Sequence, residues 1–169
     1  MSTKVQPTPE GYGTVTPWII VRGVDRFLGY LRDAFGAEEI ARIYNEDGTI
    51  GHAEARIGDS MVMMFDAAKD WPDTPAFMRL YVEDGDAVYQ RALAAGGAPV
   101  TEMTKLFFGD RVGRVRDPWG NIWWIQERME DVSPEEMGRR LQDQAYTDAM
   151  RYLQGSLDRE LSGRGEADR

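Results

Sequence analysis

Apolar positions in the first half of the chain follow two different periods. Across residues 24–35 they recur every three or four positions, which predicts a helix, and Gly36 is placed to end it. Alternating and β-branched stretches on either side predict strands. Residues 14–66 are therefore expected to form a strand, a helix and three further strands, with the strands at 14–22, 37–45, 50–57 and 60–66.

The second half repeats this order after a linker at residues 67–75, where Pro72 and Pro75 limit regular structure. A shift of 61 residues, the separation of Asp25 from Asp86, aligns the two halves without a gap. An internal repeat of this length indicates one supersecondary unit used twice. For residues 76–130 we expect a helix at 86–95 and strands at 76–83, 99–103, 106–116 and 121–128.

The two ends of the chain differ from the repeat. Residues 1–13 are rich in Pro, Gly and Thr and are expected to form a flexible arm. Within 131–169, Ser133 and Pro134 are typical of a helix start, and an apolar stripe from Met137 to Leu153 predicts a long helix buried against the same subunit or a partner. The last dozen residues are expected to be disordered. The predicted fold class is α+β, two tandem βαβββ modules and a C-terminal helix.

Composition narrows the functional classes. Of the 169 residues, 42% are hydrophobic, enough for one domain or two small modules sharing a core. No cysteine is present, which excludes disulfides and zinc–cysteine sites. The net charge of −9 argues against nucleic acid as a partner. The chain has no apolar run of membrane-spanning length and no secretion signal at its start, so we expect no membrane partner and a cytoplasmic protein.

Three stretches carry a family resemblance: residues 51–54 (Gly-His-Ala-Glu), residues 109–121 and residues 130–136. With the repeat, they resemble the PhnB-like branch of the vicinal oxygen chelate superfamily, which includes glyoxalase I, bleomycin-resistance proteins, fosfomycin-resistance enzymes and extradiol dioxygenases. The resemblance covers roughly residues 14–140. It implies cupped, mixed sheets that close around one site.

The resemblance also implies where the superfamily's metal enzymes place their ligands. Those positions in this sequence are Thr16, Met63, Phe77 and Trp124. None is a His, Glu, Asp or Gln, and divalent ions need oxygen or imidazole donors. We therefore expect no metal and no other cofactor at the usual site. A remaining alternative is a metal at a shifted site that uses His52 and Glu54.

Strand alternation predicts which side chains face the cup. His52, Glu54 and Arg79 are the candidate catalytic groups. The predicted ligand-binding residues are mostly aromatic or sulfur-containing and favour a planar hydrophobic ligand. They are Trp18, Met61, Met63, Phe65, Phe77, Tyr81, Phe108, Trp124 and Gln126. The alternative for the aromatic residues is that they only fill the interior.

Two functions remain open at this point. One is a metal-independent protein that binds a planar hydrophobic or aromatic small molecule, as antibiotic-resistance members of the superfamily do. The other is an enzyme of lyase, isomerase or cyclase type, in which His52, Glu54 or Arg79 supplies acid–base or electrostatic catalysis. Arg111 and Asp110 are expected to form a structural turn and salt bridge, with direct ligand contact as the alternative. A homodimer is expected from the resemblance and the C-terminal helix.

Overall fold

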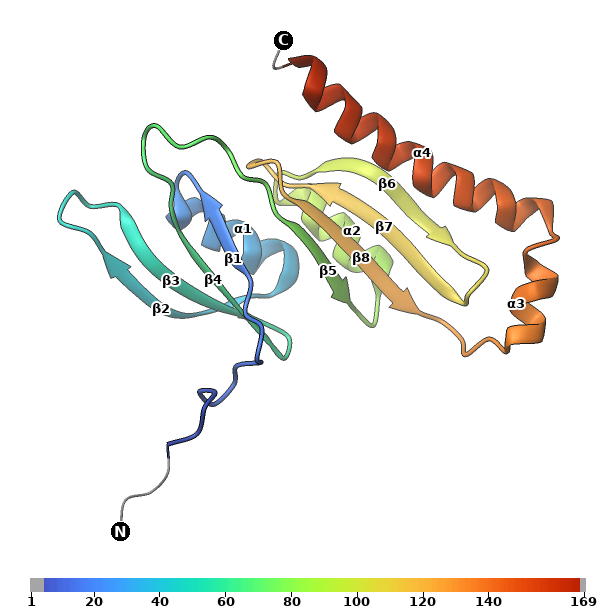
Figure 1. Cartoon of the computed structure of the whole chain (residues 1–169), viewed down its shortest axis with the longest axis horizontal. Coiled ribbons are helices and arrows are strands. Elements are labelled where there is room, and N and C mark those ends of the chain that lie inside the picture. Colours follow the sequence, from blue (N-terminus) through green and yellow to red (C-terminus); the bar gives the residue numbers. More distant parts are fainter. Residues whose placement is uncertain (1–4, 168–169) are drawn as a thin grey trace. The chain divides into compact units, whose positions relative to one another are not determined.

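A computed structural model describes residues 5–167, with side chains described to Arg164. The chain divides into two compact units, one ending at Ala76 and the other beginning at Phe77, and each is described by itself. Each unit contains a four-stranded mixed sheet and a covering helix, and the second carries the C-terminal helices (Figure 1). The predicted α+β class and tandem βαβββ arrangement are confirmed.

The first unit follows its predicted order. Its elements are β1 (Trp18–Val21), α1 (Val24–Phe35), β2 (Glu38–Tyr44), β3 (Ile50–Ile57) and β4 (Ser60–Asp66). The strand order is β1-β4-β3-β2, with β1 parallel to β4 and the other pairs antiparallel. The helix and the last two strands have the predicted bounds. The first strand is shorter than predicted because Pro17 directly before it has no backbone N–H to donate.

The second unit has the same topology. Its elements are β5 (Phe77–Tyr81), α2 (Gly85–Ala94), β6 (Ala98–Lys105), β7 (Asp110–Arg116) and β8 (Ile122–Arg128). The strand order is β5-β8-β7-β6, with β5 parallel to β8. Asp84 caps α2 by accepting a hydrogen bond from the backbone N–H of Ala87 at 2.9 Å.

The register of the two sheets corrects the gapless repeat. Met63 lies opposite Glu54, whereas its counterpart Trp124 lies opposite Arg114. The shift is therefore 61 residues for β4 and β8 but 60 for β3 and β7 (114 minus 54). The chain from Arg114 to Trp124 is therefore one residue longer than the chain from Glu54 to Met63. As a result, the position of Glu54 in the first sheet is taken by Arg114 in the second.

One face of each sheet is covered by its helix, α1 or α2. The side chains predicted to lie under the helices are buried or partly buried, and the central ones have no exposed surface: Ile19, Ala53, Ala55, Met64, Trp123 and Ile125. Helix α1 contributes Phe27, Leu31 and Ala34, all fully buried. The opposite face of each sheet, called here the open face, carries the residues predicted to face the cup.

The C-terminal segment differs from the predicted single helix. It forms α3 (Pro134–Arg140) and α4 (Gln144–Ala167), and Asp143 starts the second by accepting a hydrogen bond from the N–H of Ala145 at 2.9 Å. The last dozen residues were expected to be disordered, but α4 continues to Ala167, so this prediction is wrong up to that residue. Residues 168–169 lie outside the described chain. None of the described helices has the apolar length to cross a bilayer.

Helix α4 lies along β6 on the open face of the second sheet (Figure 1). Leu153 is 5% exposed and packs on Leu106 and Val112, which have no exposed surface. The hydroxyl groups of Thr101 and Ser156 are 2.6 Å apart and join β6 to the helix. Of the predicted apolar stripe, Leu153 is therefore buried within its own subunit and Ala149 is partly buried against the same cluster, whereas Leu141 is 50% exposed.

Candidate functional site

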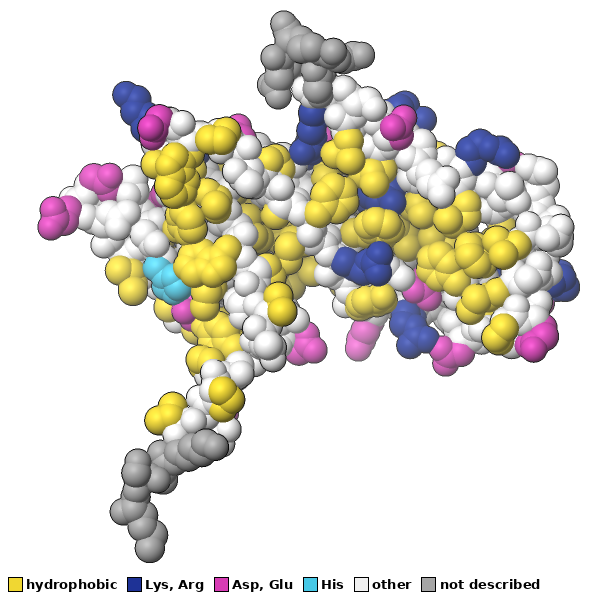
Figure 2. All heavy atoms as spheres, viewed as in Figure 1, with side chains coloured by type: hydrophobic (Ala, Val, Ile, Leu, Met, Phe, Trp, Pro, Cys, Tyr) yellow, Lys and Arg dark blue, Asp and Glu magenta, His cyan; other side chains and the backbone are white. Residues whose placement is uncertain are grey.

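The open face of the first sheet brings together three predicted site residues. Trp18 on β1 and His52 and Glu54 on β3 lie on the same side, because alternate residues of a strand share a face. The ring centroids of Trp18 and His52 are 5.4 Å apart. Figure 2 shows the single histidine among hydrophobic side chains on this unit.

Glu54 is the centre of a hydrogen-bonded group. Its Oε1 lies 2.8 Å from His52 Nε2, and its Oε2 accepts a hydrogen bond from the Tyr12 hydroxyl. These hydrogen bonds, first that from Tyr12, hold the pKa of Glu54 below its usual range, while the bond to Glu54 raises the pKa of Tyr12 to about 12. Glu54 is therefore ionised at neutral pH and orients both neighbours.

Aromatic rings extend from this group along the open face. Trp18 and Phe65 meet edge to face with centroids 5.4 Å apart, and Phe65 meets Trp71 in the same way at 6.0 Å. Trp18 and Trp71 are each 47% exposed. Large aromatic side chains left this exposed in a cluster are typical of a binding surface.

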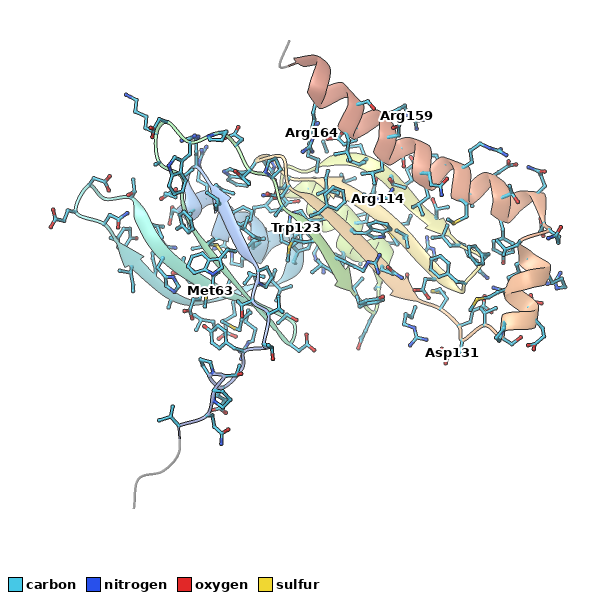
Figure 3. All side chains as sticks on the ribbon, viewed as in Figure 1. Met63, Arg114, Trp123, Asp131, Arg159 and Arg164 are labelled. Atoms are coloured by element: carbon cyan, nitrogen blue, oxygen red, sulfur yellow. The ribbon has the colours of Figure 1, made fainter. Side chains whose placement is uncertain are left out.

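The open face of the second sheet is built around Trp124. Arg79 on β5 and Arg114 on β7 flank it from the two neighbouring strands. Their Cζ atoms lie 4.7 Å and 4.0 Å from the Trp124 ring centroid, which is cation–π distance. Figure 3 shows Arg114 on β7 beside α4. Phe77 and Tyr81, on either side of Arg79 along β5, are 49% and 62% exposed.

The remaining predicted site residues are less accessible. Met61 is 7% exposed and Gln126 is 5% exposed, with the Gln126 amide donating a hydrogen bond to Asp110 at 2.5 Å. Phe108 packs against the Leu106, Val112 and Leu153 cluster under α4. Met63 is partly exposed and lies beside Trp18 in the parallel pair. Arg111 forms an ion pair with Asp86 on α2, which is the structural role expected for it.

Four residues of these two faces were not predicted as site residues. Tyr12 lies in the arm expected to be flexible, and Trp71 lies in the linker. The one-residue register change places Arg114 opposite Trp124. Helix α4 brings Leu153 to the cluster on which Trp124 packs. For Arg114, the strand alternation that placed Glu54 would have found it, given the correct shift of 60.

The residues present do not fit the superfamily's metal site. Thr16, Met63, Phe77 and Trp124 offer a hydroxyl, a thioether and two aromatic rings, which are not a donor set for Zn, Mn or Mg. Across residues 5–167, no three His, Asp or Glu side chains are grouped so that they could hold an ion. His52 and Glu54 hydrogen-bond one another, and within the described part of the chain no third His, Asp or Glu joins them.

The two βαβββ units, each with a four-stranded mixed sheet, define the class of fold. The family model of the Glyoxalase/Bleomycin resistance protein/Dioxygenase superfamily matches residues 12–125, and the chain belongs to this superfamily. Similar proteins include Mb0911c of Mycobacterium bovis and Rv0887c of Mycobacterium tuberculosis. Each is 30% identical over 158 residues, covering 85% of this chain and 98% and 88% of the two relatives respectively.

Solved structures show the same fold. TioX from Micromonospora sp. ML1 has a TM-score of 0.57 and 24% identity and covers 72% of this chain and all of its own. A PhnB protein from Bacillus cereus has a TM-score of 0.54 and 18% identity, with 68% and 99% covered. The Mn(II) complex of the fosfomycin resistance protein FosX from Listeria monocytogenes has a TM-score of 0.56 and 16% identity, with 76% and 97% covered. The resemblance to the superfamily is confirmed by the family model, and the solved structures confirm its fold.

Proposed function

We propose that this protein binds a planar aromatic or hydrophobic small molecule on the open faces of its sheets, without a metal. The exposed aromatic cluster of Trp18, Phe65 and Trp71 carries the proposal. Rings in such a cluster contact a flat ligand by offset or edge-to-face stacking, which contributes about 0.5–1.5 kcal/mol per pair beyond burial. The superfamily to which the chain belongs includes bleomycin resistance proteins, and sequestration of an antibiotic or metabolite is the biological role we infer.

Replacing Trp18 by Ala should weaken binding of a flat probe about tenfold, because it removes a half-exposed ring that contacts both Phe65 and His52. The probe is naphthalene-2-carboxamide, and the dissociation constant is measured by isothermal titration calorimetry on the full chain. Tyr44→Ala is the matched control. Tyr44 is 59% exposed and therefore also offers an accessible ring. Its hydroxyl accepts a hydrogen bond from Arg42, which pairs with Asp25 of α1, so this ring lies on the side of the helix and not on the open face.

Equal affinity of the wild-type chain and Trp18→Ala for the carboxamide would contradict a binding role for the first sheet. Native mass spectrometry of the purified protein complements the titration, because it reports a carried-over guest, any bound metal and the number of subunits. A stoichiometric divalent ion would overturn the metal-free assignment. Proteins of this superfamily commonly form dimers, and we propose a cytoplasmic homodimer.

The hydrogen-bonded group of Tyr12, Glu54 and His52 favours a second candidate, an enzyme of lyase, isomerase or cyclase type. A carboxylate that orients an imidazole beside a ligand surface supplies a general base, and general bases contribute about 10²–10⁴-fold to rate. Arg79, the third predicted catalytic group, belongs to the other unit and is not part of this hydrogen-bonded group.

If this second candidate is right, the protein should accelerate deuterium exchange at the acidic C–H positions of 2-tetralone, a flat aromatic ketone, in D₂O. His52→Gln should lower that exchange rate at least about tenfold, while the affinity for 2-tetralone measured by calorimetry stays unchanged. Nuclear magnetic resonance follows the exchange. No acceleration by the wild-type chain would remove this evidence of proton transfer and leave the binding function preferred.

A further inference from the structure

The open face of the second sheet gathers donor groups whose hydrogen bonds are incompletely satisfied among the described residues. Arg79 and Arg114 contribute guanidinium groups and Trp124 contributes an indole N–H. The Trp124 Nε1 and the Arg114 Nε atoms are both enclosed and have no partner among the described residues. Buried polar groups are normally hydrogen-bonded, so a cluster of unsatisfied donors indicates that an acceptor is missing.

Arg114 is the most unusual member, because its charge is buried without a carboxylate. It is 2% exposed, and its Nη1 donates to Thr101 Oγ1 at 3.0 Å and to the Leu153 carbonyl at 2.7 Å, both uncharged. Burial, and then the nearby charge of Arg79, lower the pKa of Arg114 to about 10. A buried charge without a counter-ion is costly, and a bound anion would offset that cost.

Arg79 adds a second charge that also lacks a counter-ion. It is exposed on β5 and has no hydrogen bond or ion pair with any described residue; its guanidinium lies over the Trp124 ring. Most other arginines of this unit lie within ion-pair distance of a carboxylate. They are Arg111, Arg116, Arg128, Arg139, Arg140, Arg151 and Arg164. In a chain of net charge −9, two unpaired arginines on one indole form a local positive site.

We propose that this cluster binds the carboxylate of a planar aromatic acid. The inference rests on the proposed binding function and names the class of its ligand. A guanidinium donates two parallel hydrogen bonds to a carboxylate, and such charge-assisted pairs are the strong ones. Phe77 and Tyr81 lie on either side of Arg79 on the same face and are exposed, so they are placed to contact the ring that carries the acid.

A matched set of probes tests the inference by calorimetry on the full chain. Naphthalene-2-carboxylate and naphthalene-2-carboxamide share a ring and differ in charge, and cyclohexanecarboxylate keeps the charge without the aromatic ring. We expect the naphthoate to bind at least about tenfold more tightly than the carboxamide, because one charge-assisted hydrogen-bonded pair contributes about this much to affinity. Arg79→Gln should abolish this preference by weakening the binding of naphthoate. Arg91→Gln on α2, an exposed arginine on the covered side, should preserve the preference.

The outcomes separate this inference from the function on which it rests. Equal binding of naphthoate and carboxamide would overturn the anion site and keep the aromatic-binding function. Binding of both carboxylates with equal affinity, and none of the carboxamide, would overturn the aromatic function and keep the anion site. No binding of any probe would overturn both. A naphthoate preference that survives in Arg79→Gln would show that Arg79 is not the anchor and would also overturn the proposal.

Discussion

Replacing Asp117 by Ala should lower the free energy of unfolding by about 3 kcal/mol or more. Asp117 lies between β7 and β8 and is 2% exposed. Its Oδ1 accepts from the N–H groups of Trp119 and Asn121 at 2.9 Å and 3.0 Å, and its Oδ2 accepts from Asn121 Nδ2 and Trp123 Nε1, both at 2.8 Å. Asn121 and Trp123 have no exposed surface, so their donors would lose their acceptor away from water.

The pKa of Asp117 identifies the source of this effect. Burial raises that pKa above its usual value in spite of the four donors. Burial therefore does not favour the ionised form of Asp117 over the protonated form. The loss of stability expected for Asp117→Ala comes instead from the four donors that lose their acceptor. Asp117→Asn keeps one carbonyl oxygen but turns an amide toward other donors, so an intermediate loss is expected.

Urea unfolding followed by tryptophan fluorescence measures this loss. Asp59→Ala is the matched control, because Asp59 lies in the turn between β3 and β4 and is exposed. Among the side chains that the structure describes, only Ser60 donates a hydrogen bond to it. We expect the Asp59→Ala change to stay within about 0.5 kcal/mol. Similar stabilities for the two variants would show that the Asp117 hydrogen bonds do not hold the second sheet together.

Replacing Leu153 by Ala should cost about 2–4 kcal/mol and loosen α4. Leu153 fills the space between the helix and the fully buried Leu106 and Val112, and Ala would leave a cavity there. Because the Leu153 carbonyl accepts from Arg114, a loosened helix should also release that guanidinium. Hydrogen–deuterium exchange should show faster exchange across residues 144–164.

Leu161→Ala on the same helix is the control for this prediction. Leu161 is 43% exposed, so its truncation should change the free energy of unfolding by no more than about 0.5 kcal/mol. If the two leucine variants unfold at the same urea concentration and exchange equally fast, the packing of α4 on β6 does not contribute to stability.

Local pattern was sufficient for most of the architecture. The bounds of α1, β3 and β4 follow from the change between helical and alternating periods, and the internal repeat implies the second unit. The same alternation separates Ile19 and Met64, under the helix, from Trp18 and Met63 on the open face. These features depend on short-range periodicity, which is written directly in the order of the residues.

The composition of the two open faces depended on contacts between distant residues. Tyr12 reaches Glu54 across 42 positions, and Arg114 meets the Leu153 carbonyl across 39. One extra residue between Arg114 and Trp124, compared with Glu54 and Met63, places an arginine at the position of Glu54, and a gapless alignment of the halves conceals that change. The sequence alone determined the fold and the aromatic character of the open faces. Only the tertiary structure decided which polar groups meet there, because strand register and helix docking depend on packing across the whole unit.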